Sequence, residues 1–249
     1  MAASALLQLQ GVSRRLAGRT IVEDLTLSLD RGCVLGLLGV NGAGKSTTLR
    51  VIAGVLAPSA GKVSFDGRDF GEEPALARRL GYLPETPPLY AELRVDEYLA
   101  FCARLRGMRA ANARKAVDRV TERCGLGDMR RRLCGNLSKG YAQRAGIAQA
   151  IVHDPDLIVL DEPASGLDPV QAASVRELVR ELGRERAVVL STHLLHDVTA
   201  CCGRVAILHR GRLRHDGALT DLAAAGTGSD SLETVFFRIA SGGDAQAAA

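Results

Sequence analysis

Alternation between apolar and polar side chains predicts strands near the start of the chain. Residues 7–12 and 26–29 alternate apolar with polar positions and flank a polar turn at residues 18–19, so two strands are expected there. Residues 34–38 form the short apolar run of a buried strand, and residues 47–53 are typical of a helix that ends at a glycine. The chain therefore opens with a β-rich segment that leads into a strand and a helix.

The middle of the chain changes to a helical pattern. Residues 62–65 and 80–83 are predicted strands, and residues 75–79 a short helix between them. From residue 95 to residue 153, apolar side chains recur every three or four positions, which predicts amphipathic helices. We interpret residues 88–153 as an inserted helical subdomain. The apolar face of its first helix is expected to hold Val95, Tyr98, Leu99, Cys102 and Leu105.

Strands and helices alternate again after Pro155. The expected strands are residues 157–160, 187–190 and 204–208, and the expected helices are residues 169–182 and 194–200. Strands as uniformly apolar as residues 157–160 belong in a parallel sheet that is covered on both faces. The pattern thus predicts an α/β protein, and 249 residues fit one large domain or two small ones. Residues 241–249 are small and polar enough for a disordered tail.

The segment between residues 34–38 and the following helix carries a phosphate-binding pattern. Gly39 is followed by four residues and then by Gly44, Lys45 and Ser46. At such a strand-to-helix junction, free backbone N–H groups and the helix dipole hold a polyphosphate. A chance glycine-rich turn is the alternative, but the chain has only four lysines against 28 arginines, so a lysine at this position is informative. The candidate phosphate-binding residues are Gly39, Asn41, Gly42, Ala43, Gly44, Lys45, Ser46 and Thr47.

Two carboxylates follow the apolar strand at residues 157–160. Ligands of parallel α/β sheets bind at the carboxyl ends of the strands, so Asp161 and Glu162 are expected beside the phosphate loop. Asp161 and the Ser46 hydroxyl suit Mg²⁺, and Glu162 suits the base that polarises an attacking water. A strand that merely ends in polar residues is the alternative, and the upstream phosphate loop argues against it.

Further motifs stand in order around these two. The segment Leu137-Ser138-Lys139-Gly140-Tyr141 precedes the carboxylates, and Ser165-Gly166-Leu167-Asp168 and Ser191-Thr192-His193 follow them. With these motifs the chain resembles the ATP-binding subunits of ABC transporters over residues 7–239. The resemblance implies a single ATP-binding domain over residues 1–240. Its P-loop NTPase (ABC ATPase) fold would have a mixed or parallel sheet core, an N-terminal antiparallel β subdomain and the inserted helical subdomain.

The resemblance also implies a mechanism with ATP and Mg²⁺ as cofactors. Two such domains, in this case two copies of the chain, face each other head to tail, and Ser138 and Gly140 of one copy complete the ATP site of the other. Asp168 lies in the family's D-loop, and His193 is its switch histidine, which contacts the γ-phosphate. Lys45, Glu162 and His193 are then the catalytic set. Taken alone, Ser138 has the simpler role of a helix N-cap, and His193 that of a core histidine.

Two positions depart from the usual pattern of the family. Glu85 stands where a glutamine is common, and its carboxylate is expected in the ATP site, near Mg²⁺ or the attacking water, where it adds negative charge. Leu16 stands where an aromatic residue stacks on adenine. Glu85 and the signature variant with Lys139 and Tyr141 resemble the ABC-2 branch, whose permeases are separate membrane proteins and often exporters. Residues 85–93 are where the permease is expected to dock, although an ordinary surface loop is the alternative.

Composition bears on the partners and the cellular location that we expect for such an ATPase. A net charge of +4 and 4% aromatic residues argue against a nucleic-acid partner. No apolar run approaches the roughly 18 residues of a membrane span, and the N-terminus makes a poor signal peptide, so we expect a cytoplasmic protein held at the membrane by its permease. The six cysteines lack zinc-ligand spacing and are expected to be buried thiols. The rival interpretations are a non-transport ABC-type ATPase acting on nucleic acid or ribosomes, and a nucleotide sensor.

Overall fold

An antiparallel sheet forms the N-terminal part of the protein. The computed structural model describes residues 5–224 and 232–240. Its first sheet has the strand order β2-β1-β4-β5, and neighbouring strands are antiparallel. The predicted antiparallel β subdomain is thereby confirmed. Its strands are β1 (Leu7–Leu16), β2 (Arg19–Leu29), β4 (Ala60–Phe65) and β5 (Arg68–Asp69).

Strands β1 and β2 are longer than their alternation predicts. The register between them shifts near Leu9, Val12 and Arg14, and Gly11 (φ 59°) and Asp24 (φ 49°) take left-handed backbone conformations. Bulges of this kind break the two-residue period that marks a strand in sequence. Only residues 7–12 and 26–29 show a clear alternation, so the sequence predicted only these parts of the two strands.

The second sheet carries the centre of the fold. Its six strands have the order β10-β9-β3-β8-β7-β6, and all neighbours are parallel except β9 and β10. This mixed sheet confirms the predicted sheet core. Its strands are β3 (Val34–Leu38), β6 (Leu80–Leu83), β7 (Leu157–Asp161), β8 (Ala187–Thr192), β9 (Arg204–His209) and β10 (Arg212–Ala218).

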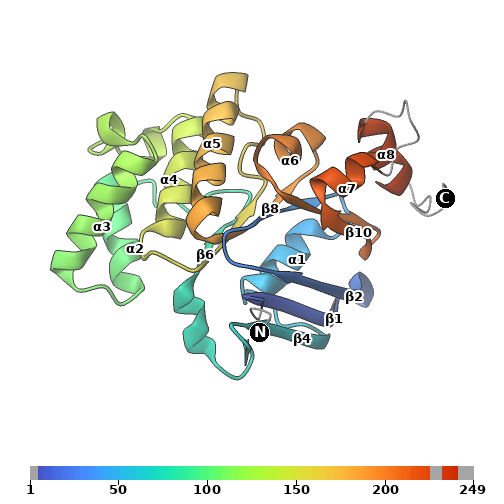
Figure 1. Ribbon diagram of the computed structural model, residues 1–249. Coiled ribbons are helices and arrows are strands. Elements are labelled where there is room, and N and C mark those ends of the chain that lie inside the picture. The colour runs from blue at the N-terminus through green and yellow to red at the C-terminus, as the bar shows by residue number, and fades with distance from the viewer. Residues whose placement is uncertain (1–4, 225–231, 241–249) are drawn as a thin grey trace.

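Burial on both faces explains why the central strands are uniformly apolar. Along β7, Leu157 and Val159 pack into one hydrophobic core, whereas Ile158 and Leu160 pack into the other. The first core lies between the two sheets and includes Leu49 of α1 (Lys45–Ile52). In Figure 1, α1 accordingly lies between the antiparallel sheet and the central sheet. Since every residue of such a strand faces a core, no polar alternation is left.

Helices cover the opposite face of the central sheet and extend away from it. In Figure 1, α5 and α6 stand over this face, α4 lies next to them, and α2 and α3 form the outermost layer. Side chains of α2, α3 and α4 belong to the same core as Leu83, Leu160 and Leu190 of the sheet. The described helices are α2 (Val95–Leu105), α3 (Ala110–Arg123), α4 (Lys139–Ile151), α5 (Pro169–Glu185), α6 (Leu195–Cys201), α7 (Leu219–Ala224) and α8 (Leu232–Ala240).

Several local expectations need correction. The short helix expected at residues 75–79 is the 3₁₀ helix Pro74–Arg79, and further 3₁₀ turns at Gly127–Met129 and Cys134–Asn136 interrupt the helical region. Leu105 is 69% exposed because α2 ends there, beyond the core that its other apolar residues reach. All six cysteines are free, but Cys33 and Cys102 are only half-buried.

Along residues 5–224 and 232–240, none of the helices is both long enough and apolar enough to cross a bilayer. The tail expected at residues 241–249 lies outside the described residues.

Candidate functional site

The phosphate loop joins β3 to α1, as its motif requires. Its glycines are needed for close packing: a Cβ at Gly39 would lie 2.6 Å from the Leu208 carbonyl oxygen, and one at Gly44 would lie 2.9 Å from that of Ile21. Gly44 also has a φ of 102°, which disfavours residues with a side chain. Strands β2 and β9 therefore hold the loop from two sides, so that its backbone N–H groups are presented at the start of α1.

Lys45 lies against its own loop in a buried position. Its side chain is 6% exposed, and Nζ donates hydrogen bonds to the carbonyl oxygens of Gly39 at 2.7 Å and Val40 at 3.4 Å. Its one ion-pair partner within the described residues is Glu162, whose Oε1 lies 3.6 Å away. The ammonium group is thus paired loosely, at a distance beyond an ordinary charge-assisted hydrogen bond.

Asp161 is a fully buried carboxylate at the end of β7. Its Oδ1 accepts hydrogen bonds from the hydroxyls of Ser46 at 3.0 Å and Ser191 at 2.6 Å. No described group hydrogen-bonds to its Oδ2, and a buried carboxylate oxygen is costly to leave without a partner. A hydroxyl next to an unsatisfied carboxylate oxygen is a hard oxygen donor set, which fits Mg²⁺.

Glu162 and His193 meet at the other side of the loop. The Glu162 backbone has a φ of 49° and its N–H donates to the Ser191 hydroxyl at 2.9 Å. His193 Nδ1 lies 3.1 Å and 3.0 Å from the two Glu162 carboxylate oxygens. Because a carboxylate accepts, Nδ1 carries the proton in this contact. The strained backbone and two hydrogen bonds together fix the direction of the Glu162 carboxylate.

These side chains enclose one cleft of about 500 Å³. The predicted residues from Asn41 to Thr47, together with Glu85, Glu162 and His193, line it, whereas Gly39 and Asp161 are buried beneath. Ile21 and Ser165 also line the cleft and were not predicted. Ser165 is the first residue of the motif at residues 165–168, which the sequence analysis identified. Ile21 lies in the part of β2 that was not predicted, because the bulges break its alternation. Leu16 does not line the cleft.

Three predicted residues lie outside this cleft. Ser138 is exposed at the N-cap of α4, and its hydroxyl makes no capping hydrogen bond, contrary to the expectation that it would cap the helix. Gly140 packs against the Gln171 side chain so closely that a Cβ would collide with its Oε1. Asp168 caps α5 by accepting a hydrogen bond from the Gln171 N–H at 2.9 Å. The beginnings of α4 and α5 are therefore neighbours on the exposed surface.

Comparisons with known proteins agree with this geometry. The sequence profile described as "ABC transporter" matches residues 22–165. The ABC transporter ATP-binding protein NatA of Bacillus subtilis is 39% identical over 205 residues, which are 81% of this chain and 83% of NatA. The bacitracin transport ATP-binding protein BcrA of Bacillus licheniformis is 34% identical over 213 residues, which are 84% of this chain and 69% of BcrA.

A solved structure described as the ATP-binding subunit of an ABC transporter has the same fold. It matches with a TM-score of 0.84 and 32% identity over 94% of this chain and 99% of that one. The phosphate loop and the carboxylates at the end of β7 lie within the residues that the family profile matches. The chain therefore belongs to the ABC transporter family, as an ATP-binding subunit that hydrolyses ATP and works with a membrane permease.

Proposed function

We propose that the cleft binds ATP with Mg²⁺ and that its residues have separate roles in hydrolysis. The N–H groups at the start of α1 and Lys45 would hold the phosphates, and the Ser46 hydroxyl and Asp161 would hold Mg²⁺. When bound, Mg²⁺ neutralises charge on the phosphate oxygens. The loose 3.6 Å contact between Lys45 and Glu162 supports this assignment, since a phosphate can replace it at little cost.

Glu162 is the proposed base for the attacking water. Its carboxylate is 11% exposed, lies at the cleft and is oriented by His193 Nδ1 and by its own backbone N–H bond. Removal of a proton in the transition state requires a carboxylate that is fixed in direction but still reachable by water. His193, which is 39% exposed, is the proposed contact to the γ-phosphate through its other ring nitrogen. Glu85 lines the same cleft and adds negative charge near the phosphates.

We also propose that two copies of the chain form the active unit, head to tail. One observation carries this proposal: Ser138 is exposed, lies outside the cleft and has a hydroxyl free of capping bonds. The adjacent Gly140 and Asp168 place the first turns of α4 and α5 side by side on this surface. The N-terminus of α4 lacks a side-chain cap, whereas that of α5 is already capped by the Asp168 carboxylate. A helix N-terminus favours negative charge, so the γ-phosphate of ATP bound by a second copy is a suitable partner for the start of α4.

Sedimentation of a hydrolysis-impaired variant tests the dimer. Glu162→Gln should double in mass when ATP and Mg²⁺ are added, because ATP is retained between the copies. The same variant carrying Ser138→Arg should bind ATP but stay monomeric, because a long side chain would block the exposed start of α4. A doubled mass in both variants would place the contact elsewhere, and no doubling in either would contradict ATP-driven dimerisation.

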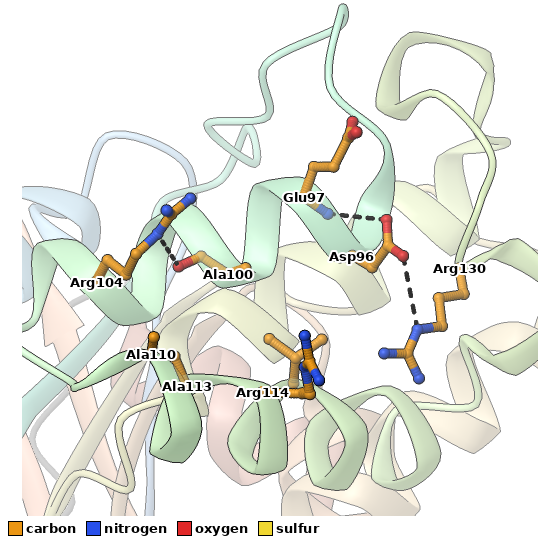
Figure 2. A pocket seen from close by; sticks show the side chains of 9 residues that line it. Asp96, Glu97, Ala100, Arg104, Ala110, Ala113, Arg114 and Arg130 are labelled. Atoms are coloured by element: carbon orange, nitrogen blue, oxygen red, sulfur yellow. Dashed lines mark hydrogen bonds and ion pairs between the residues drawn. The ribbon is translucent and has the colours of Figure 1, made fainter.

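A hollow between α2 and α3 is the surface that we assign to the permease. It has a volume of about 360 Å³. Figure 2 shows Ala100, Ala110 and Ala113 at this hollow, with Arg104, Arg114 and Arg130 around it. The lining residues are Asp96, Glu97, Ala100, Arg104, Ala110, Ala113, Arg114, Val117 and Arg130.

The charges of this hollow favour an acidic partner segment. Arg130 is already paired with Asp118 at 2.6 Å and with Asp96 at 3.7 Å. Among the described residues, Arg104 bonds only to the Ala100 carbonyl oxygen of its own helix. Arg114 has no hydrogen bond or ion pair to any described residue. Because two guanidinium groups remain without carboxylates above an apolar floor, we propose that a permease segment with apolar and acidic side chains docks here.

The loop at residues 85–93 is part of the same proposed surface. Tyr90 is 51% exposed and packs edge to face on Tyr98 (6.0 Å between ring centroids) and Phe101 (5.6 Å) of α2. The Tyr98 hydroxyl donates to the Pro88 carbonyl oxygen at 3.0 Å, so the loop is held firmly on α2. An exposed aromatic side chain on a rigid loop is a common anchor of protein interfaces.

Docking to a permease would place the protein on the cytoplasmic face of the membrane. Glu85 and the signature with Lys139 and Tyr141 resemble the ABC-2 branch, so export is the proposed direction. Gentle detergent extraction of membranes with the tagged chain tests this: an integral membrane protein at equal stoichiometry supports the proposal. Replacement of Arg104 and Arg114 by glutamate should remove that protein, with Arg19 and Arg210 replaced by glutamate as the control. Recovery only with ribosomes or nucleic acid would contradict it.

A further inference from the structure

The last residues of β8 bond to two different parts of the protein. Ser191 faces the cleft residues: its hydroxyl donates to Asp161 Oδ1 and accepts from the Glu162 N–H. The next residue, Thr192, faces the other side of the sheet, where its hydroxyl donates to Asp197 Oδ2 at 2.8 Å. Side chains alternate along a strand, so Ser191 and Thr192 bond on opposite faces of the sheet, and His193 directly follows them.

Asp197 of α6 is the second anchor, and both of its oxygens are used. Besides the bond from Thr192, its Oδ1 accepts from Arg176 Nη1 of α5 at 2.9 Å. The side chains of Asp197 and Arg176 are 8% and 15% exposed. Burying an ion pair costs desolvation energy, and a hydrophobic pair can pack as well, so the pair itself is poor support for stability. A role in setting geometry is the better explanation.

The backbone on both sides of His193 is tied to this carboxylate. Thr192 precedes the histidine, and its hydroxyl oxygen also accepts a hydrogen bond from the backbone N–H of Leu194, which follows, at 3.1 Å. The chain on either side of His193 is therefore held by one hydroxyl group, and that hydroxyl is held by Asp197. His193 in turn contacts both Glu162 oxygens, so a shift of the His193 ring would also change the position of the Glu162 carboxylate.

We propose that Asp197 and Arg176 are positioning residues for ATP hydrolysis, which act through Thr192 to place His193 against Glu162. This inference rests on the role proposed above for His193. The ion pair also ties that histidine to α5, the helix that begins after Asp168 at the exposed surface. Neither Asp197 nor Arg176 lines the cleft, so their effect is expected on turnover and not on the binding of ATP.

Steady-state kinetics of the full chain in its active assembly tests the proposal. Asp197→Asn keeps the shape but weakens the pair with Arg176, and it should lower kcat about tenfold or more while the KM for ATP changes less than about twofold. Thr192→Val should have the same effect, and Thr192→Ser, which retains the hydroxyl, should restore most of the turnover. Arg176→Lys should retain more turnover than Arg176→Met. Asp216→Asn breaks a comparable pair with Arg204 away from the cleft and serves as the control.

A double-mutant cycle separates positioning from a merely structural role. In a His193→Ala background, Asp197→Asn should change kcat less than about twofold, because the residue that it positions is gone. An equal loss of turnover in both backgrounds, or full turnover of Asp197→Asn, would overturn the inference. If His193→Ala itself retains full turnover, the role proposed for His193 is wrong, and a loss in Asp197→Asn would then show that the pair acts by another route.

Discussion

His153 joins the end of the signature helix α4 to strand β6, and its protonation should weaken the folded state. Its Nε2 contacts the Leu80 carbonyl oxygen at 3.1 Å, so this nitrogen donates, and the buried Nδ1 has no partner among the described groups. Burial, and then the charge of Arg106, lowers the pKa of His153 from 6.5 to about 4. The folded protein therefore holds this histidine neutral.

The sign and size of the effect follow from proton linkage. The pKa of His153 is lower in the folded state, so between the two pKa values the unfolded state binds more protons and stability falls as the pH falls. The full loss, reached below the folded pKa, is about 3 kcal/mol for a difference of this size. At pH 5.5 the loss should already be about 1 kcal/mol, and at pH 7.5 close to zero.

Urea unfolding at pH 7.5 and 5.5 measures this contribution. In His153→Gln, the amide can still donate to the Leu80 carbonyl oxygen but does not titrate. The drop in unfolding free energy between the two pH values should therefore be about 1 kcal/mol smaller in the variant than in the wild type. His196→Gln, at an exposed position, is the matched control. Equal pH dependence in wild type and His153→Gln would refute the reasoning.

Further predictions concern the ATP site. Lys45→Ala should abolish ATP binding or turnover in equilibrium titration and hydrolysis assays, because no other lysine or arginine lines the cleft in the described structure; unchanged binding and turnover would contradict its role. Although Leu16 does not line the cleft, a tyrosine there should tighten ATP binding by the roughly 0.5–1.5 kcal/mol of base stacking, and matched titrations of Leu16→Tyr without any gain would count against this. Gly140→Ala should lower ATPase activity modestly because its Cβ displaces the flexible Gln171 amide that packs between α4 and α5, and Gln171→Ala should recover part of the loss. Activity that is no higher in the double variant would show that this contact is not the cause.

Much of the central sheet could be predicted because its strands are buried on both faces. The apolar runs in β3, β7 and β8 contain no polar positions, so their assignment as buried strands is unambiguous. Each nucleotide motif directly follows one of these runs. In contrast, β10 is an edge strand with no fully buried residue, so Arg212–Ala218 carries no hydrophobic signal. The family resemblance supplied the order of the subdomains.

Within the site, sequence motifs identified residues but not their contacts. The segment from Asn41 to Thr47 lines the cleft as expected, since a strand-to-helix loop is a local structure. Ile21 reaches the cleft from a different sheet, so no local sequence pattern could predict its contact with the cleft. The hydroxyl of Ser138 makes no capping bond although its position predicts one. The buried contact between Asp197 and Arg176 joins two helices, and neither residue belongs to a recognisable motif.

ATP binding and hydrolysis measured side by side for wild type and Glu162→Gln test the role of Glu162 most directly. The amide keeps the size of the side chain but cannot accept a proton. Glu162→Gln should bind ATP as tightly as the wild type and hydrolyse it slower by about two to four orders of magnitude. Full turnover by Glu162→Gln would contradict the assignment of the base, and with it the mechanism proposed for this cleft.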